Sequence, residues 1–512
     1  MIDFFQTPPQ LGNQYEEDKI LKSYLKRVLP AEMRVEIEPD LIHLGHRVVT
    51  DIGALGEAAE ACPPKHVPYE SWGRRIDKIK TSEAWKQLDR ISAEEKLVAI
   101  GYERKYGAYS RIYQFAKIYL FHPSSAIYTC PLAMTDGAAR VIELYGDQAL
   151  KDRAFSRLTS YNPDKFWTSG QWMTERTGGS DVSCTSTVAK PEGSDYRLYG
   201  TKWFSSATTA QMAMTLARIE GSPTGSKGLS LFYVETHENN IRVNRLKDKL
   251  GTCALPTAEL TLEGTRAKLV GGVGEGVKKI ASLLNITRIY NACCALGYMR
   301  RGIALAKDYA SKRQAFGRLL SEHPLHQQTL FELEAELEAA FYLVFRTVEL
   351  LGKEEVGEAT QDESALLRVL TPLVKLYTAK QAVAVMSEVL ECFGGAGYIE
   401  DTGLPKLLRD AQVLSIWEGT TNILSLDVLR AIKKEKVTEA FLRDILNRTS
   451  DPKVLESCAG LRNYFESMNT MSEEQQQRGA RQLAYRMVKT YAQSMVNASF
   501  AIFCDKNQME VN

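Results

Sequence analysis

The 512-residue sequence lacks any apolar run of the length, about 18 residues or more, that a membrane-spanning helix needs. It also lacks an excess of charge of either sign, because 64 basic residues stand against 63 acidic ones. A chain this close to neutral has no overall field that attracts nucleic acid or acidic lipid, so a charged ligand must be bound by a local site. We therefore expect no membrane span and no general nucleic-acid-binding surface.

Cysteine and histidine patterns typical of disulfide frameworks or metal sites are also missing. The nine cysteines are odd in number and form no CxxC pair, which is typical of reduced thiols in an intracellular protein. Two HxxH pairs occur, at His43/His46 and His323/His326, but neither belongs to an HExxH motif or lies near a cysteine cluster. We predict no metal site.

Targeting signals are equally scarce at the two ends of the sequence. The first residues, MIDFFQTPPQLGNQYEEDK, have no basic segment and carry several acids, which argues against a secretory signal or a transit peptide. The final residues, MEVN, are not a peroxisomal signal. We expect a cytoplasmic protein, or a mitochondrial one if a leader has been removed.

The periodicity of the sequence changes along a chain that is longer than the roughly 250 to 300 residues that one core supports. Residues 1–165 have a mainly helical pattern. Residues 166–270 hold short β-prone runs separated by Gly, Ser, Thr and Asn, which predict a small antiparallel β domain. From residue 271 the helical period returns, and four or more helices predict a bundle over residues 271–430. The predicted fold class is mainly α with a central β domain.

Two helices of this bundle have predicted limits. From Leu330 onward, apolar residues recur in steps of three and four, and Gly352 is the expected end of that helix. The next helix is predicted to start with Thr371 as N-cap and Pro372 at its first position.

Three motifs contain residues suited to binding a polar ligand. MTERTGGSDVS, residues 173–183, combines hydroxyls with paired glycines that let a ligand approach the backbone. KRQAFG, residues 312–317, offers an arginine that can grip a phosphate beside an aromatic ring. The third runs from ECFGGAGY, residues 391–398, to IWEGTTN, residues 416–422, where Glu418 stands between an indole and a glycine. Taken singly, each of these motifs also fits an ordinary loop or a solvated charge.

In combination, the motifs resemble the acyl-CoA dehydrogenase family, whose flavin loop reads T-E-x-x-x-G-S-D and whose C-terminal signature runs from R-D-A to E-G-T. TERTGGSD without the usual proline, KWFSS, RLKDKLG and WEG followed by T-x-N resemble its AidB-like branch. The resemblance implies an N-terminal helical domain, a middle antiparallel β-barrel and a C-terminal helical bundle. It also implies an additional helical region, which residues 431–512 would supply.

The resemblance implies FAD as cofactor, although no Rossmann-type GxGxxG follows a strand. From the middle domain it implies Met173, Thr174, Gly179, Ser180, Phe204, Ser205 and Ser206 as FAD-binding residues. Phe204 stands where the family has a tryptophan. From the bundle it implies Thr420 and Asn422, and it implies Arg313, Phe316, Glu391 and Gly395 as contacts to the FAD of a neighbouring subunit. Glu391 replaces a common glutamine. These contacts imply a homotetramer built as a dimer of dimers.

The same resemblance implies a fatty acyl-CoA as substrate, with Ser180, Asn285 and Arg288 along its groove. Asn285 stands where many relatives have aspartate. Removal of hydrogens from Cα and Cβ of a thioester needs a base for the α-proton, and a carboxylate in an apolar slot suits that task. Glu418 matches the family's catalytic base, and its backbone N–H would help to polarise the thioester carbonyl.

The sequence leaves three functions open. The first is FAD-dependent dehydrogenation of acyl-CoA, with an electron-transfer flavoprotein as the possible acceptor. The second is a flavoprotein that sequesters medium- or long-chain acyl-CoA with little turnover, because residues 204, 285 and 391 depart from the family pattern. The third, DNA binding, is disfavoured because the charges of the C-terminal region are mixed in sign.

Overall fold

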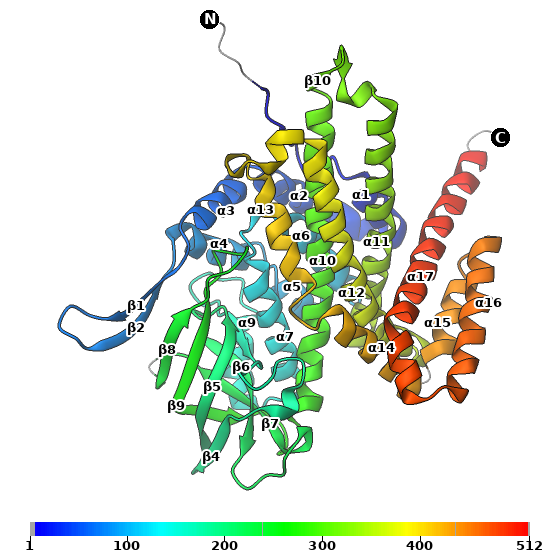
Figure 1. The fold of residues 1–512 in the computed structure, drawn as a ribbon. Helices are drawn as coiled ribbons and strands as arrows, with labels where there is room; N and C mark the ends of the chain where they lie inside the picture. The colour runs from blue at the N-terminus through cyan, green and yellow to red at the C-terminus, as the bar shows by residue number, and fades with distance from the viewer. Residues whose placement is uncertain (1–5, 238, 436, 510–512) are drawn as a thin grey trace, which may run out of the picture. The chain divides into compact units, whose positions relative to one another are not determined.

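The computed structural model describes residues 6–237, 239–435 and 437–509 and divides the chain into two compact units (Figure 1). The first unit comprises residues 1–46, 104–120 and 291–512. The second unit comprises residues 47–103 and 121–290. Each unit therefore combines segments that are distant in the sequence. None of the described helices has both the length and the hydropathy that crossing a bilayer requires.

The described part of the first unit is almost entirely helical. Its helices are α1 (Lys19–Val28), α2 (Ala31–Arg47), α6 (Tyr109–Phe121), α11 (Pro324–Val356), α12 (Gln361–Cys392), α13 (Leu404–Leu414), α14 (Thr421–Glu435), α15 (Val437–Leu446), α16 (Pro452–Ser467) and α17 (Glu473–Met509). The long helix α10 (Gly276–Ala310) enters this unit at residue 291. Helix α12 packs against α11, α13, α14, α15 and α17, so it is the central helix of this bundle.

The second unit contains the β-barrel and several helices. Its helices are α3 (Asp51–Ala61), α4 (Glu83–Glu94), α5 (Ala99–Glu103), α7 (Thr129–Tyr145), α8 (Gln148–Leu150) and α9 (Ser156–Leu158), with a π-helical turn at Lys151–Phe155. Its strands are β1 (Lys65–Tyr69), β2 (Arg75–Lys80), β3 (Ser169–Trp172), β4 (Val188–Glu192), β5 (Asp195–Ser206), β6 (Met212–Ile219), β7 (Leu229–Glu235), β8 (Ile241–Leu246) and β9 (Thr257–Leu269).

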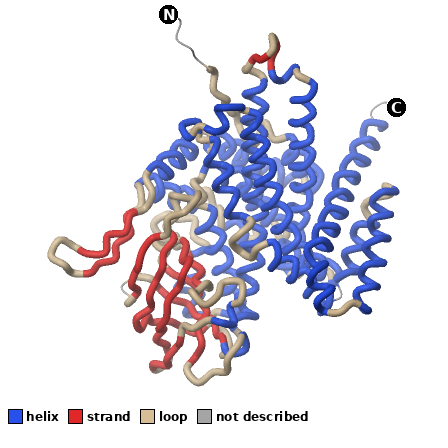
Figure 2. The backbone as a smooth tube through the Cα atoms, in the orientation of Figure 1, coloured by secondary structure: helices blue, strands red, loops and turns tan. Residues whose placement is uncertain are grey.

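Five strands of the second unit close into a barrel (Figure 2). Going round it, β4 pairs with β5, β5 with β9, β9 with β7, β7 with β6, and β6 with β4. Strands β3 and β8 extend this sheet by pairing with β6 and β9. The prediction of a mainly helical chain with a central β-barrel is confirmed.

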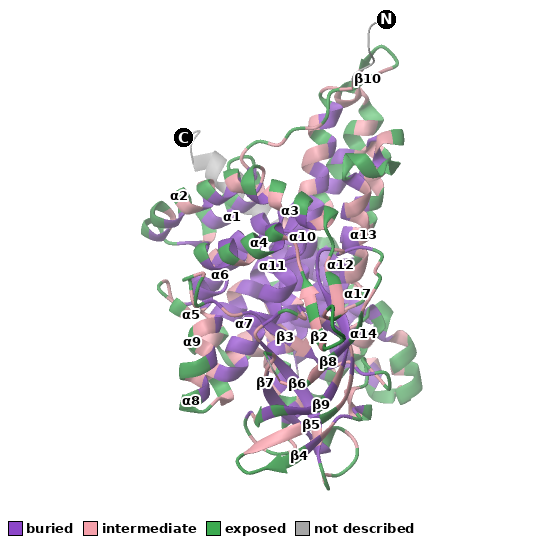
Figure 3. Cartoon of the chain, turned by 90° about the vertical axis from the view of Figure 1, so that its left-hand side faces the viewer, coloured by how far each residue is buried: buried purple, intermediate pink, exposed green. Residues whose placement is uncertain are grey.

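Both faces of strand β6 are buried, which explains its apolar sequence MAMTLARI (Figure 3). Ala213 and Ala217 belong to one apolar cluster, together with Phe232 and Leu260. Met212, Met214 and Leu216 belong to the other, which includes residues of α7 and α10. Side chains alternate across a strand, so a strand covered on both sides needs apolar residues at every position.

Three sequence-based expectations about local structure are wrong: two concern the limits of helices, and the third concerns the strands. Helix α11 ends at Val356, with Gly357 in the left-handed conformation, and not at Gly352. A Cβ at Gly352 would lie 2.0 Å from the carbonyl oxygen of Ala108, so this glycine permits close packing instead of ending the helix. Helix α12 starts after Thr360, and Pro372 lies inside it.

The true start of α12 has a capping box that the sequence also contains. The hydroxyl of Thr360 accepts from the backbone N–H of Glu363, and the Glu363 carboxylate accepts from the backbone N–H of Thr360. The helix continues through Pro372 because residues 369–379 are all buried, and the packing of these side chains outweighs the loss of one backbone hydrogen bond.

The third expectation concerned the strands. The barrel is not wholly antiparallel, because β6 pairs in parallel with both β3 and β4. The mainly helical N-terminal segment also contains an antiparallel hairpin of β1 and β2. Its turn includes Gly73 with φ +88°, and Trp72 beside it is 95% exposed.

Candidate functional site

The IWEGTTN motif forms the turn between α13 and α14 in the first unit. The backbone N–H groups of Ile416 and Trp417 both donate to the carbonyl of Val413, at 2.9 and 3.1 Å. The chain then reverses through two consecutive positive φ angles, +55° at Glu418 and +102° at Gly419. A left-handed conformation costs a residue with a Cβ roughly 1–2 kcal/mol, so the surrounding structure must hold Glu418 in place.

Two buried side chains support this turn. The Nζ of Lys375, on α12, donates to the carbonyl oxygen of Gly419 at 2.6 Å, and Lys375 is fully buried. Asn291, on α10, donates to the carbonyl of Leu414 at 3.1 Å and accepts from the indole N–H of Trp417. The half-buried carboxylate of Glu418 is thus held on a fixed backbone.

Sequence reasoning missed both supports. The available signal was a single lysine or asparagine within an otherwise apolar helical run, TPLVKLYTA and IYNACCA. Such a residue is buried only with a hydrogen-bond partner, and it therefore marks a specific contact.

The two predicted FAD-binding residues that follow Glu418 are both exposed. Thr420 directly precedes α14, and Asn422 lies in the first turn of that helix. The side-chain oxygen of Asn422 accepts from the guanidinium of Arg481, on α17, at 3.4 Å. The C-terminal region therefore contributes a cation beside the predicted cofactor residues.

The predicted contacts to a neighbouring subunit lie at two exposed places in the first unit. Phe316 and Gly317 form the two-residue turn between the short strands β10 (Gln314–Ala315) and β11 (Arg318–Leu319). Phe316 has φ +51° and is 98% exposed, an unusual conformation for a bulky residue. Arg313 is also exposed, and the described residues include no ion-pair partner for its guanidinium.

Glu391 and Gly395 are exposed near the end of α12. A Cβ at Gly395 would meet nothing within 4 Å, so the backbone there is open to a ligand. Burial, reinforced by the charges of Glu388 and Glu391, raises the pKa of Cys392 to about 11, so this thiol stays protonated at neutral pH.

In the second unit the TERTGGSD motif follows β3. Its Glu175 forms a buried ion pair with Lys202 of β5. Lys202 donates to the Glu175 carboxylate at 2.7 Å and to the carbonyl of Leu216 at 2.8 Å. Glu175 also accepts from the backbone N–H and hydroxyl of Ser186, each at 2.7 Å, and from Thr187. Burial acts to raise the pKa of Glu175, but the charge of Lys202 and these hydrogen bonds hold it below its usual value. The acid of the motif is therefore structural.

The predicted ligand residues surround this anchor. Met173 is buried, Thr174 is half-buried, and Ser180 is exposed. A Cβ at Gly179 would lie 3.0 Å from the Thr174 methyl group and 3.1 Å from its hydroxyl, so Gly179 is what lets the loop close over Thr174.

The KWFSS motif contains an irregularity in strand β5. The register between β5 and β9 shifts between Lys202 and Ser205, which is a β-bulge that redirects Trp203 and Phe204. Phe204 is 55% exposed. The hydroxyl of Ser205 is buried with no hydrogen-bond partner among the described residues, and the Ser206 hydroxyl lies 3.1 Å from that of Thr257.

The predicted substrate residues Asn285 and Arg288 lie three positions apart on α10, so they share one face of the helix. Both are half-buried. Ser180, Asn285 and Arg288 therefore all belong to the second unit.

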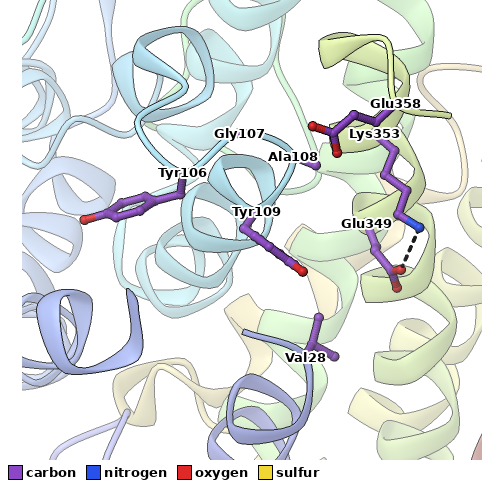
Figure 4. Close-up of a pocket in the computed structure, with 8 residues that line it drawn as sticks. All are labelled: Val28, Tyr106, Gly107, Ala108, Tyr109, Glu349, Lys353 and Glu358. Carbon is purple, nitrogen blue, oxygen red and sulfur yellow. Dashed lines mark ion pairs between the residues drawn. The ribbon is translucent and has the colours of Figure 1, made fainter. Parts of the chain in front are cut away.

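A cavity of about 390 Å³ in the first unit lies elsewhere (Figure 4). It is lined by Val28, Tyr106, Gly107, Ala108, Tyr109, Glu349, Lys353 and Glu358. Its lysine is already paired with Glu349 at 3.7 Å and with Glu363 at 2.7 Å. None of the predicted site residues lines this cavity.

Comparisons with known proteins match nearly the whole chain. Residues 6–165 match the model of the adaptive response protein AidB N-terminal domain, residues 170–265 the acyl-CoA dehydrogenase middle domain, and residues 274–433 the acyl-CoA dehydrogenase C-terminal domain. Acyl-CoA dehydrogenase family member 11 of Caenorhabditis elegans is 43% identical over 99% of this chain and 88% of its own length. The chain belongs to the acyl-CoA dehydrogenase family.

Two solved structures resemble this family member over almost their full length. The apo-form of Bd2924 has a TM-score of 0.93 and 53% identity, covering 97% of this chain and 100% of that one. The crystal structure of Caenorhabditis elegans ACDH-11 in complex with C11-CoA has a TM-score of 0.93 and 43% identity, covering 98% and 89%.

Acyl-CoA dehydrogenase family members typically bind FAD, and the side chains present suit that cofactor. The second unit offers the orphaned hydroxyl of Ser205, the exposed ring of Phe204 and the exposed hydroxyl of Ser180. The first unit offers Thr420 and Asn422, together with the exposed cation of Arg313. Hydroxyl donors, a ring face and a cation are the groups that a flavin and its diphosphate require. Among the described residues, by contrast, no group of three or more potential ligands could hold a metal ion.

Proposed function

We propose that this protein catalyses the FAD-dependent α,β-dehydrogenation of a fatty acyl-CoA. The observation that carries the proposal is the geometry of Glu418, a half-buried carboxylate in a left-handed backbone conformation that Lys375 and Asn291 hold from behind. Backbone strain at one acid, maintained by fully buried polar contacts, is typical of a catalytic position.

In the proposed reaction the Glu418 carboxylate takes the α-proton of the thioester, and its backbone N–H donates to the thioester carbonyl. FAD, when bound, supplies the acceptor for the β-hydride. Support for an acyl-CoA ligand comes from the related protein whose crystal structure contains C11-CoA. Ser180, Asn285 and Arg288 are the proposed contacts to the CoA thioester.

The proposed FAD-binding residues come from both units. In the second unit they are Met173, Thr174, Gly179, Ser180, Phe204, Ser205 and Ser206, and in the first they are Thr420 and Asn422. Arg313, Phe316, Glu391 and Gly395 are proposed to reach the FAD of a neighbouring subunit in a homotetramer. Phe316 is almost fully exposed in a strained turn, so its ring contributes no packing within its own chain. This exposure supports a contact with a neighbouring subunit.

We further propose four functional regions, at residues 1–165, 166–270, 271–430 and 431–512. An electron-transfer flavoprotein is the proposed acceptor of electrons, and cytoplasm the proposed location. The break between β9 and α10, at residues 270–275, supports the boundary between the second and third regions.

The experiment that tests the proposal is the substitution Glu418→Gln, which removes the base and keeps the size of the side chain. Bleaching of the flavin by acyl-CoA under anaerobic conditions should slow by about 10²- to 10⁴-fold, the usual contribution of a positioned general base. FAD content and acyl-CoA affinity, measured on the same sample, should stay at wild-type values. Glu332→Gln, at an exposed position on α11, is the matched control. A Glu418→Gln variant that bleaches at the wild-type rate would assign the base to another residue.

A second candidate function is the sequestration of acyl-CoA with little turnover. The observation in its favour is that ACDH-11 was crystallised with C11-CoA, together with the departures from the family pattern at Phe204, Asn285 and Glu391. A wild-type protein that binds acyl-CoA chains of several lengths without bleaching would favour sequestration over dehydrogenation.

A further inference from the structure

We propose that Arg176, Trp203, Lys247 and Phe204 form a cation–aromatic stack that holds Phe204 as a rigid, positively charged wall of the flavin site. The proposal rests on the proposed function, because it assigns Phe204 to the FAD. It goes further by giving roles to Arg176, Trp203 and Lys247, which are not among the proposed FAD-binding residues.

The stack is defined by three contacts within the second unit. The ammonium of Lys247 lies 3.7 Å from the centroid of the Trp203 ring and 4.7 Å from that of Phe204. The guanidinium of Arg176 lies 5.6 Å from the Trp203 ring. Each distance is within the range of about 6 Å in which a cation is attracted to a ring face. One lysine thus joins two neighbouring aromatic residues.

The local backbone explains how two successive residues come to face one lysine. Successive side chains of a regular strand point to opposite faces, but Trp203 and Phe204 lie in the bulge of β5, where that alternation is broken. Lys247 directly follows β8, and its backbone N–H donates to the carbonyl of Thr257 at 2.8 Å. Its position is therefore set by the same sheet that carries the aromatic pair.

Lys247 is also held at its charged end. Its ammonium bonds to the Glu259 carboxylate at 2.6 Å, and the side chain is only 11% exposed. Glu259 also accepts from Arg245 at 2.8 Å. Glu259 is thus shared by two cations, and with Arg176 nearby the group of four charges carries a net surplus of two positive charges. This side of the site is positive although the whole chain is close to neutral.

The stack also connects two departures of this sequence from the family pattern. Arg176 occupies the place of the usual proline in the flavin loop, and Phe204 occupies the place of the usual tryptophan. Here the indole is one residue earlier, at Trp203, where it contacts both cations. We infer that Trp203 has become a support and that the smaller ring of Phe204 meets the flavin.

Two physical effects follow for a bound flavin. A ring that is already held in position loses little conformational freedom on binding, so less affinity is lost to ordering. A fixed positive charge beside the flavin favours its reduced, electron-rich form, so it raises the reduction potential. Lys247 therefore positions Phe204 and contributes a positive charge, but it does not take part in the reaction itself.

The test is Lys247→Met, which keeps an aliphatic side chain but removes the ammonium. We expect FAD to bind the reconstituted apoprotein roughly 3- to 30-fold more weakly, the range expected for a partly desolvated cation–π contact. The visible flavin spectrum should change, and the reduction potential should become more negative. Lys247→Arg should restore both properties. Arg176→Met, at an exposed position, should weaken FAD binding less.

Lys190→Met is the matched control, because Lys190 also lies over an aromatic ring in the same unit. Its ammonium is 5.5 Å from the Tyr199 ring and pairs with Glu220 at 3.8 Å, and none of these residues is a proposed site residue. The variant should leave flavin affinity and potential unchanged. If wild-type protein binds FAD and Lys247→Met has the same affinity, spectrum and potential, the stack is overturned while the proposed function stands. If folded wild-type protein takes up no FAD, both proposals are overturned together.

Discussion

Two turns that carry predicted functional residues, one in each unit, are each supported by a fully buried lysine. In the second unit, Lys202 lies behind the TERTGGSD loop, and in the first unit, Lys375 lies behind the IWEGTTN turn. Each lysine donates to a backbone carbonyl, Lys202 to that of Leu216 and Lys375 to that of Gly419. Lys202 also donates to the buried carboxylate of Glu175.

The difference suggests that Lys202 mainly stabilises the fold of its unit, whereas Lys375 mainly positions a turn. The carboxylate of Glu175 is itself buried and bonded to Ser186 and Thr187, so Lys202 completes a closed polar network whose loss affects the whole barrel. Lys375 donates to the carbonyl of Gly419, the residue that directly follows Glu418 and its strained backbone. Loss of Lys375 should therefore affect the position of the proposed base more specifically than the stability of its unit.

The largest effect is expected from Lys202→Met. Removing one partner of a buried ion pair leaves the other charge uncompensated, which costs about 3–5 kcal/mol in the free energy of unfolding. Chemical denaturation followed by the fluorescence of the barrel tryptophans measures this loss. Lys190→Met, at an exposed lysine of the same unit, should change stability by less than about 0.5 kcal/mol. Equal losses in the two variants would show that Lys202 is not a structural anchor.

A smaller loss of stability but a clear loss of activity is expected from Lys375→Met. A hydrogen bond from a charged donor contributes about 1.5–3 kcal/mol, and its loss frees the Gly419 peptide. We expect kcat for acyl-CoA oxidation to fall by a larger factor than FAD content, because the turn carries the proposed base, whereas most of the proposed FAD-binding residues lie outside it. Lys380→Met, an exposed lysine on the same helix, is the control. Unchanged kcat in a Lys375→Met protein that has lost stability would make this lysine purely structural.

A third effect, of roughly 1–2 kcal/mol, is expected from Gly419→Ala because its φ of +102° disfavours a side chain. The new Cβ would also lie 3.1 Å from the Leu424 side chain, which is buried and has to shift. Gly357→Ala separates the two causes, since Gly357 has φ +77° but nothing within 4 Å of the point where a Cβ would lie. The midpoint of thermal unfolding should be lower for Gly419→Ala than for Gly357→Ala. The reverse order would contradict the packing argument.

The smallest effect near neutrality concerns pH. Folding lowers the pKa of Glu175, so the ionised carboxylate stabilises the folded state. This contribution to the free energy of unfolding is complete above the ordinary glutamate pKa of about 4.3 and is lost as the pH falls through the lowered pKa of the folded state. Unfolding midpoints should therefore be insensitive to this group between about pH 8 and 6 and decline in acid. In Lys202→Met the sign should reverse, because an unpaired buried carboxylate has a raised pKa and is stabilised by protonation. The same acid slope in both proteins would contradict the pairing.

The sequence predicted the features that depend on neighbouring residues. The alternation of helical and β-prone segments indicated a mainly helical chain with a central barrel, and this was confirmed. Helix limits were harder to predict: Gly352 has the local pattern of a helix end, but it lies inside α11 because the backbone at Ala108 approaches it closely. A glycine in the sequence does not reveal whether it ends a helix or permits close packing, since that depends here on a contact with a residue more than 200 positions away.

For the candidate site, the amino-acid order alone specifies which residue types stand in the turns: the TERTGGSD loop, the KWFSS strand and Glu418 between Trp417 and Gly419. Short-range order is enough for this, because turn chemistry and motif spacing are local. What holds those turns emerges only from the folded chain, as in the contacts of Lys375 with Gly419, Asn291 with Leu414, and Lys247 with Trp203. The physical reason is that a buried polar group must find its partner in space, and packing, not sequence distance, selects that partner.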